Sequence, residues 1–292
     1  MFTADGERGG LARTGVSRTI PTLKRRGRWL PGLLLSILLL ATGGCRGLGQ
    51  TPPPSPFDPE SLATALALTE NAPPPGFETV AFPAVDEGLS ELSGYHYRLE
   101  MRFEGVLDRD SQSSTTGHIL AEVWWDGIAP ARRVVLEAEG DSFVAEPRRL
   151  EGVRLGEDYY LVDGEGRCLM NVTETARAVA NLDAGSLIGG VTEAAYSGTQ
   201  AVLNGVQAYR YDVTVQNATL PAIYLVEDSG LDVTGELWVA PEYHAVVRYY
   251  ANVAVSNVRL FESDLPVSGQ VFIRYDMFDL DVVPNISIPY GC

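Results

Sequence analysis

The residues of this chain with the clearest chemical potential are its three cysteines, Cys45, Cys168 and Cys292. Thiols can be acylated, or paired as disulfides, once a protein has left the reducing cytoplasm. Cys45 follows a segment with the layout of a secretory signal: basic residues, an apolar run over residues 29–41, and three small residues. The sequence therefore predicts export, with residues 1–44 as a cleaved signal peptide.

The position of Cys45 resembles the lipobox of bacterial lipoproteins, in which this cysteine is diacylated and becomes the new N-terminus. Arg25, Arg26 and Arg28 supply the basic segment, and Thr42 departs from the family preference for Leu. The alternative is a signal anchor, but an apolar run of 13 residues is shorter than the roughly 20 that span a bilayer. The resemblance implies a cell-envelope protein, extracellular or periplasmic, lipid-anchored through Cys45 to the outer face of a bacterial membrane.

The other two cysteines fit an exported protein. In an oxidising compartment, Cys168 and Cys292 most simply form a disulfide that ties the C-terminal strand to the middle of the domain. Two unpaired thiols are the alternative. Two cysteines this far apart do not suggest a zinc site.

Enzyme chemistry finds little support in the residue types. Lys24 is the only lysine, so none remains after the signal for a P-loop, a Schiff base or a Ser-x-x-Lys nucleophile. His96, His118 and His244 are widely separated, and neither H-E-x-x-H nor G-x-S-x-G occurs. We expect no enzymatic activity, no cofactor and no metal site, with the histidines on sheet surfaces.

The charge balance excludes several classes of partner. Residues 1–44 hold seven of the 22 basic and two of the 38 acidic residues, so the remaining chain has a net charge near −21. Nucleic acids and anionic bilayer surfaces select clustered positive charge instead. We expect no nucleic-acid partner, and membrane attachment only through the lipid anchor.

The elements that follow Cys45 divide into a tether and one domain. Residues 45–58 are rich in proline and too poor in apolar residues to fold, so we interpret them as a tether. Asp58 and Pro59 then mark the start of a helix over about residues 59–70. Residues 59–292 suffice for a single domain with one sizeable core.

Alternation of apolar and polar residues dominates this domain. From Tyr95 to Phe103, every second side chain is apolar and the others are polar, which is typical of a half-buried strand. The strands expected from such patterns are 95–103, 119–125, 132–139, 153–162, 166–170, 209–215, 233–240, 245–255 and 271–278. Turns are expected at 163–164 and 240–243. The fold class is mainly β (α+β): a curved antiparallel half-barrel of about 9–11 strands covered by a few short helices.

The alternation is interrupted once, over residues 173–190. This segment favours short helices, with Thr173 as N-cap and an apolar stripe from Ala176 to Leu182. The apolar face of a sheet must be covered, and this segment and the helix at 59–70 are the candidate covers. Little helix over a large sheet favours an apolar cavity beneath it.

The order of these elements resembles the LolA-like lipoprotein superfamily, in particular its lipid-carrying LppX/LprG-type members. The segment Val202–Tyr211 resembles one strand of that family and Gly235–Ala240 another, and the resemblance spans about residues 85–288. It implies a half-barrel closed by helices over a cavity that holds acyl chains, and a role in moving or retaining lipids or lipoproteins. The family shares no fixed set of binding residues, so none is transferred.

Paired aromatic residues are the candidate lining of such a cavity. In Trp124-Trp125, Tyr159-Tyr160 and Tyr249-Tyr250, alternation directs one ring to each face of the sheet. The residues expected to contact a ligand, with Leu187 and Ile188 forming a lid, are Trp125, Tyr159, Leu187, Ile188, Tyr209, Tyr249 and Val271. Plain core packing is the alternative, because alternation does not separate a filled core from an open one.

The sequence thus predicts an envelope lipoprotein that binds a lipid or another long apolar ligand, with a membrane transporter as a candidate protein partner. The alternative is a non-catalytic scaffold, or a solute-sensing module, with a packed barrel.

Overall fold

The computed structural model describes residues 71–107, 110–141, 143, 148–261, 263 and 265–292. All of them belong to one compact unit. The expected signal, Cys45, the tether and the helix at 59–70 lie outside the described residues. Within these ranges, no helix has both the length and the apolar character needed to cross a membrane.

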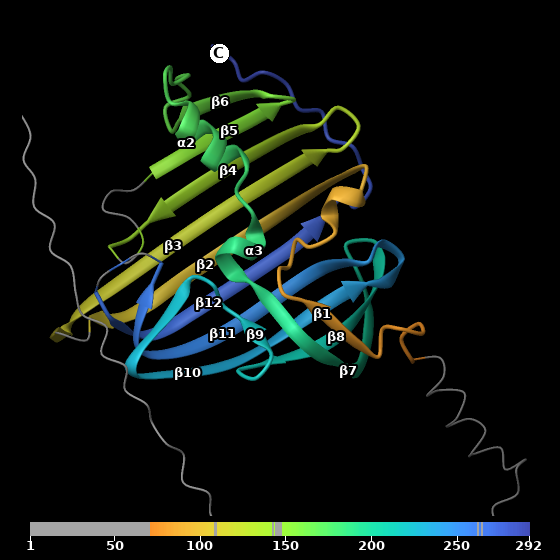
Figure 1. Cartoon of the computed structure of the whole chain (residues 1–292), viewed down its shortest axis with the longest axis vertical. Coiled ribbons are helices and arrows are strands. Elements are labelled where there is room, and N and C mark those ends of the chain that lie inside the picture. Colours follow the sequence, from red (N-terminus) through yellow and green to blue (C-terminus); the bar gives the residue numbers. More distant parts are fainter. Residues whose placement is uncertain (1–70, 108–109, 142, 144–147, 262, 264) are drawn as a thin grey trace, which may run out of the picture. The chain divides into compact units, whose positions relative to one another are not determined.

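Twelve strands of the described chain form one antiparallel, open and curved sheet, which confirms the predicted fold class (Figure 1). Their order is β1-β7-β8-β10-β11-β12-β2-β3-β4-β5-β6, with the short β9 paired to β7. The strands are β1 Thr79–Phe82, β2 Gly94–Leu107, β3 Asp110–Asp126, β4 Ala131–Glu139, β5 Arg148–Leu155, β6 Asp158–Asp163, β7 Gly190–Leu203, β8 Val206–Thr214, β9 Ala218–Thr219, β10 Ile223–Ala240, β11 Ala245–Leu260 and β12 Val267–Phe278.

Alternation along β2 separates two faces of the sheet, as predicted. Tyr97, Leu99 and Phe103 are fully buried on the concave face, whereas Arg98 and Arg102 are exposed on the convex face. The convex face carries cross-strand ion pairs and cation–π contacts, among them Arg98–Glu122, His118–Glu100, Arg248–Asp276 and Arg133 over the ring of Trp124. Such a face is stable in water and leaves only the concave face to be covered.

Two short helices lie on the concave side: α2 at Thr173–Ala180 and α3 at Ala184–Ile188 (Figure 1). Glycine at position 152 of β5 lets α2 approach closely, because a Cβ there would lie 2.7 Å from the Ala180 nitrogen. Ala176 and Val179 of α2 are buried, as predicted. The predicted N-cap is wrong by one residue: Val172 is the N-cap and Thr173 is already helical.

Two strand predictions need correction, and three strands were not predicted. The expected strand 153–162 is two strands, β5 and β6, joined by a turn at Gly156, whose positive φ of 60° suits a glycine. Residues 166–170 form no strand, only a single bridge from Cys168 to Val162. The strands that were not predicted are β1, β7 and β9; in β7, Thr, Glu, Ser and Gln occur without strict alternation.

The C-terminal segment is an irregular strap across one end of the strands (Figure 1). Ser93 donates its backbone N–H (3.0 Å) and its hydroxyl (2.6 Å) to Oδ1 of Asp281. At Gly94 the strap approaches so closely that a Cβ would lie 2.4 Å from the Val282 carbonyl oxygen. The predicted pairing of Cys168 with Cys292 is confirmed, but Cys292 ends this strap and not a strand.

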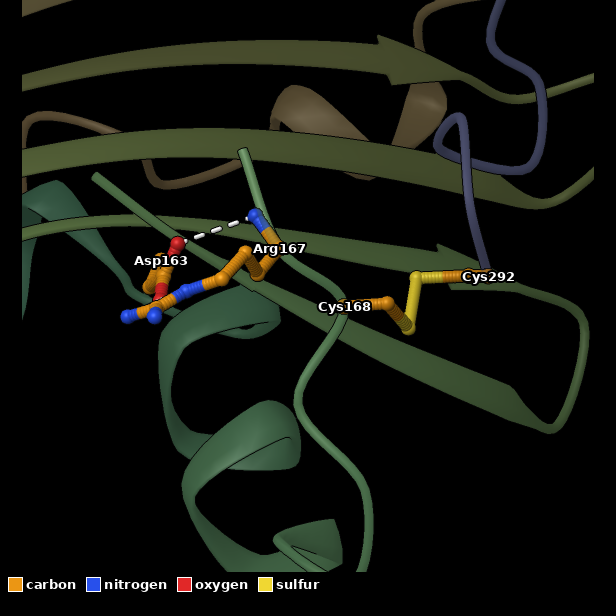
Figure 2. The surroundings of a disulfide bond; sticks show 4 residues. All are labelled: Asp163, Arg167, Cys168 and Cys292. Carbon is orange, nitrogen blue, oxygen red and sulfur yellow. Dashed lines mark hydrogen bonds and ion pairs between the residues drawn. A yellow bond between two sulfur atoms is a disulfide. The ribbon is translucent and has the colours of Figure 1, made fainter. Parts of the chain in front are cut away.

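The turn after β6 leads directly into Cys168, one of the two cysteines of that disulfide (Figure 2). Oδ1 of Asp163 accepts the backbone N–H groups of Glu165 (3.0 Å) and Arg167 (2.9 Å), and Oδ2 pairs with the Arg167 guanidinium at 2.7 Å. These hydrogen bonds lower the pKa of the Asp163 carboxyl. The disulfide therefore anchors the strap to a turn that is itself ordered, at the β6 edge of the sheet.

Candidate functional site: two pockets on the concave face

An apolar pocket of about 720 Å³ opens on the concave face beside α3. We call it the apolar pocket. It is lined by Ile119, Leu136, Ala138, Asp141, Phe143, Leu182, Ser186, Leu187, Pro221, Ala222, Tyr224, Leu260, Phe261 and Ser263. Its volume lies within the roughly 300–1,000 Å³ typical of ligand sites, and most of its lining is apolar.

Strands β3 and β4 supply the floor of the apolar pocket. Ile119 lies opposite Ala138, and Ala121 lies opposite Leu136, in the antiparallel register. All four side chains therefore share one face of the sheet. At the rim, the rings of Phe143 and Phe261 meet edge to face, with centroids 4.9 Å apart.

The α3 segment forms one wall of the pocket and is anchored at both ends. Its Gly185 N–H donates to Oδ1 of Asp86 at 2.9 Å. Ile188 is fully buried. Gly189, which follows, has a φ of 68°, and a Cβ there would lie 1.9 Å from the Thr219 carbonyl oxygen. Between these anchors, Leu187 is one of the residues that line the pocket.

The seven residues expected to contact a ligand all lie on the concave side, but they do not form one site. Leu187 lines the apolar pocket. Ile188, Tyr249 and Val271 are fully buried in the core. The remaining three are half-buried elsewhere: Trp125 beside Arg154, Tyr159 beneath Arg177 of α2, and Tyr209 against Tyr196. Their contact with a ligand stays a prediction.

Several lining residues escaped the sequence analysis. Alternation in β3 and β4 predicts that the floor residues Ile119, Leu136 and Ala138 face inward. It does not distinguish residues that line a pocket from inward residues that are packed in the core. Phe143 and Phe261 lie outside strands, where no periodicity reports burial.

A second, polar pocket of about 460 Å³ lies on the other side of α3, and Ser186 lines both pockets. We call it the polar pocket. Its charged and aromatic lining consists of Asp86, Tyr95, Trp125, Arg132, Arg154 and Asp183.

Hydrogen bonds hold Arg132 in place within the polar pocket. Its Nη2 donates to the Tyr97 hydroxyl at 3.2 Å and to the Leu182 carbonyl, and its Nη1 lies 3.8 Å from the Asp183 carboxylate. Burial raises the pKa of the Asp86 carboxyl, although the hydrogen bond from Gly185 opposes this shift. Burial likewise raises the pKa of Tyr95.

The three histidines lie apart from both pockets. His96 stacks on Trp124 with centroids 4.6 Å apart, His118 lies between Glu100 and Glu139, and His244 packs against aromatic rings. Burial lowers the pKa of His96. No group of three or more histidine, cysteine or acidic residues that could hold a metal occurs in the part of the chain the structure describes.

No family model matches the chain, and no curated protein matches it.

Proposed function

We propose that the protein is an exported envelope lipoprotein that binds a lipid, or another long apolar ligand, in the apolar pocket. The observation that carries this proposal is the apolar pocket itself, about 720 Å³ in volume and open beside a short helical wall. Sheet residues form its floor, and Leu187 of α3, with Leu182 just before α3, forms its wall. A protein that only needed a packed core would gain stability by filling such a space.

The chemistry of the lining supports an apolar ligand over a polar solute. Ile119, Leu136 and Ala138 present only hydrocarbon, and the two phenylalanine rings at the rim add aromatic surface. Burial of an alkyl chain against such a surface contributes about 0.8 kcal/mol per CH₂ group. The same proposal includes a lipid anchor at Cys45 and transfer of the ligand between the membrane and a protein partner. It also includes membership of the LolA-like superfamily.

A packed scaffold is the second candidate, and one observation favours it. Under strands β11 and β12 the concave face is filled, with Tyr249, Val271 and Tyr275 fully buried. The region between β3, β4 and α3 instead holds the apolar pocket. The two candidates therefore differ in what occupies the apolar pocket.

The substitution Leu187→Asp tests the proposal. It places a carboxylate in the apolar wall, so binding of a fluorescent alkyl-chain probe to the full chain should weaken at least about tenfold, because a desolvated charge is costly. Val202→Asp is the matched control, since Val202 is 68% exposed on β7 and outside the pocket lining.

Circular dichroism establishes that both variants fold. Equal probe binding by folded Leu187→Asp and by the wild type would remove the apolar pocket as the binding site. No binding by any of the three proteins would favour the packed scaffold.

A further inference from the structure

The floor of the polar pocket is part of one transverse row of side chains that crosses five strands. In the antiparallel register, Tyr95 lies opposite Trp125, Trp125 opposite Arg132, Arg132 opposite Arg154, and Arg154 opposite Tyr159. Directly opposed residues share a face, so two arginines stand side by side between aromatic rings.

Two opposed arginines repel one another unless negative charge compensates them. Arg132 has partial compensation from Asp183, at 3.8 Å. Arg154 forms no ion pair with any residue in the described ranges. Its Nη1 donates to the neutral Asn181 amide oxygen at 2.8 Å, and its guanidinium lies 5.3 Å from the centre of the Trp125 ring.

The pocket also holds buried donors that lack acceptors. Nε of Arg132 and Nε1 of Trp125 are both inaccessible to solvent and form no hydrogen bond among the described residues. The Arg132 side chain is 11% exposed. Buried donors of this kind normally have a partner, so the protein itself leaves the hydrogen-bonding capacity of this row unfilled.

The two carboxylates of the pocket do not fill this role. Asp86 is held at α3 by the Gly185 N–H and contacts neither arginine by hydrogen bond or ion pair in the described structure. Asp183 is 63% exposed and reaches only Nη1 of Arg132.

We propose that the polar pocket binds the anionic head group, a phosphate, of an amphiphile whose chain occupies the apolar pocket. Arg154 is the principal charge partner, since its guanidinium can offer paired N–H donors to phosphate oxygens. Arg132, directly opposite Arg154, adds a second positive charge. Ser186 lines both pockets, which places head group and chain on the two sides of α3. This inference rests on the proposed function.

Isothermal titration calorimetry of the full chain with three matched probes tests the inference. Dodecyl phosphate carries chain and charge, dodecanol carries the chain alone, and inorganic phosphate carries the charge alone. The wild type should bind dodecyl phosphate at least about tenfold more tightly than dodecanol, as expected for charge-assisted hydrogen bonds.

Arg154→Gln should abolish that preference and leave dodecanol binding unchanged. Arg149→Gln is the matched control, because Arg149 lies on the same strand, is exposed and pairs with Glu137 at 2.8 Å. It should bind all three probes as the wild type does.

Equal affinity of the wild type for dodecyl phosphate and dodecanol would overturn the inference and leave the proposed function standing. Failure of both chain probes, with phosphate binding that Arg154→Gln removes, would overturn the proposed function and assign the pocket to a free anion. An unchanged preference in folded Arg154→Gln would also overturn the role of Arg154.

Discussion

The two halves of the concave face obey the same alternation but differ in their cover. In the packed half, formed by β10, β11 and β12, the inward residues Tyr249, Val271 and Ile273 are at most 2% exposed. In the open half, β3 and β4 form the floor of the apolar pocket and the ends of β10 and β11 border it, and Leu136 and Leu187 are half-buried there.

The difference comes from the element that lies over each half. One hydrophobic core runs beneath both halves, and on the packed side it includes buried residues of β1 and β7, such as Phe82 and Val191. The sheet thus curls back and covers this half with its own strands (Figure 1). Over the open half, the helices that the described residues form are α2 and the five-residue α3. Strands of the same sheet fill the concave side of the packed half, whereas the apolar pocket remains open beside the short helix α3.

The largest effect is expected from removing the disulfide, which closes a loop with a sequence separation of 124. The double variant Cys168→Ser, Cys292→Ser should lose about 3–5 kcal/mol in the free energy of unfolding, measured with urea. Hydrogen exchange should rise in β5 and β6, beside the strap anchor, before it rises in β11 and β12. Equal urea midpoints for the oxidised wild type and the double variant would contradict this.

Cavity-forming substitutions should separate the two halves directly. Ile273→Ala in the packed half should lower the free energy of unfolding by about 2–4 kcal/mol, because its neighbours cannot collapse into the space. Leu187→Ala at the open half should cost under about 1 kcal/mol, since Leu187 already borders a pocket. Equal losses in urea denaturation would show that both halves are packed alike.

The docking of α2 on β5 depends on a missing side chain. Gly152→Ala should lower the free energy of unfolding by about 1–3 kcal/mol, because the new Cβ meets the Ala180 nitrogen at 2.7 Å. Gly164→Ala is the control: its nearest contact would be 3.4 Å, and it should change stability by less than about 0.5 kcal/mol. Similar thermal unfolding of the two variants would argue against tight docking.

The smallest effect concerns pH and the polar pocket. Because burial raises the pKa of Asp86 from 3.8, the folded state holds this proton more tightly than the unfolded state. The resulting stability is present below the unfolded pKa and is lost as pH rises through the folded pKa. Relative to Asp86→Asn, the wild type should therefore be more stable near pH 4 than near pH 7. A difference in unfolding free energy that is the same at both pH values would contradict this.

Alternation in the sequence predicted the strands whose two sides face different surroundings. It succeeded for β2, where Tyr97 and Arg98 point to opposite faces, and for β12. It failed for β7, which lacks a regular pattern, and at Gly156, where a tight turn interrupts an apolar run. Period-two patterns report which face a residue occupies but not what lies above it.

The candidate site was therefore only partly predictable. Leu187 was identified because it lies in the helical segment that interrupts the strand pattern. The opposition of Arg132 and Arg154 depends on the register of β4 and β5, which alternation within a single strand does not report. The filling of the packed half depends on how far the sheet curls, which no local pattern encodes.

The most direct test of the account is native mass spectrometry of the full chain, gently purified from a lipid-rich bacterial host. The account predicts a mass above that of the protein alone, from a bound amphiphile, which Leu187→Asp loses and Val202→Asp keeps. A ligand-free mass for the wild type, or a bound mass that Leu187→Asp leaves unchanged, would contradict the central claim that the open half is a binding site.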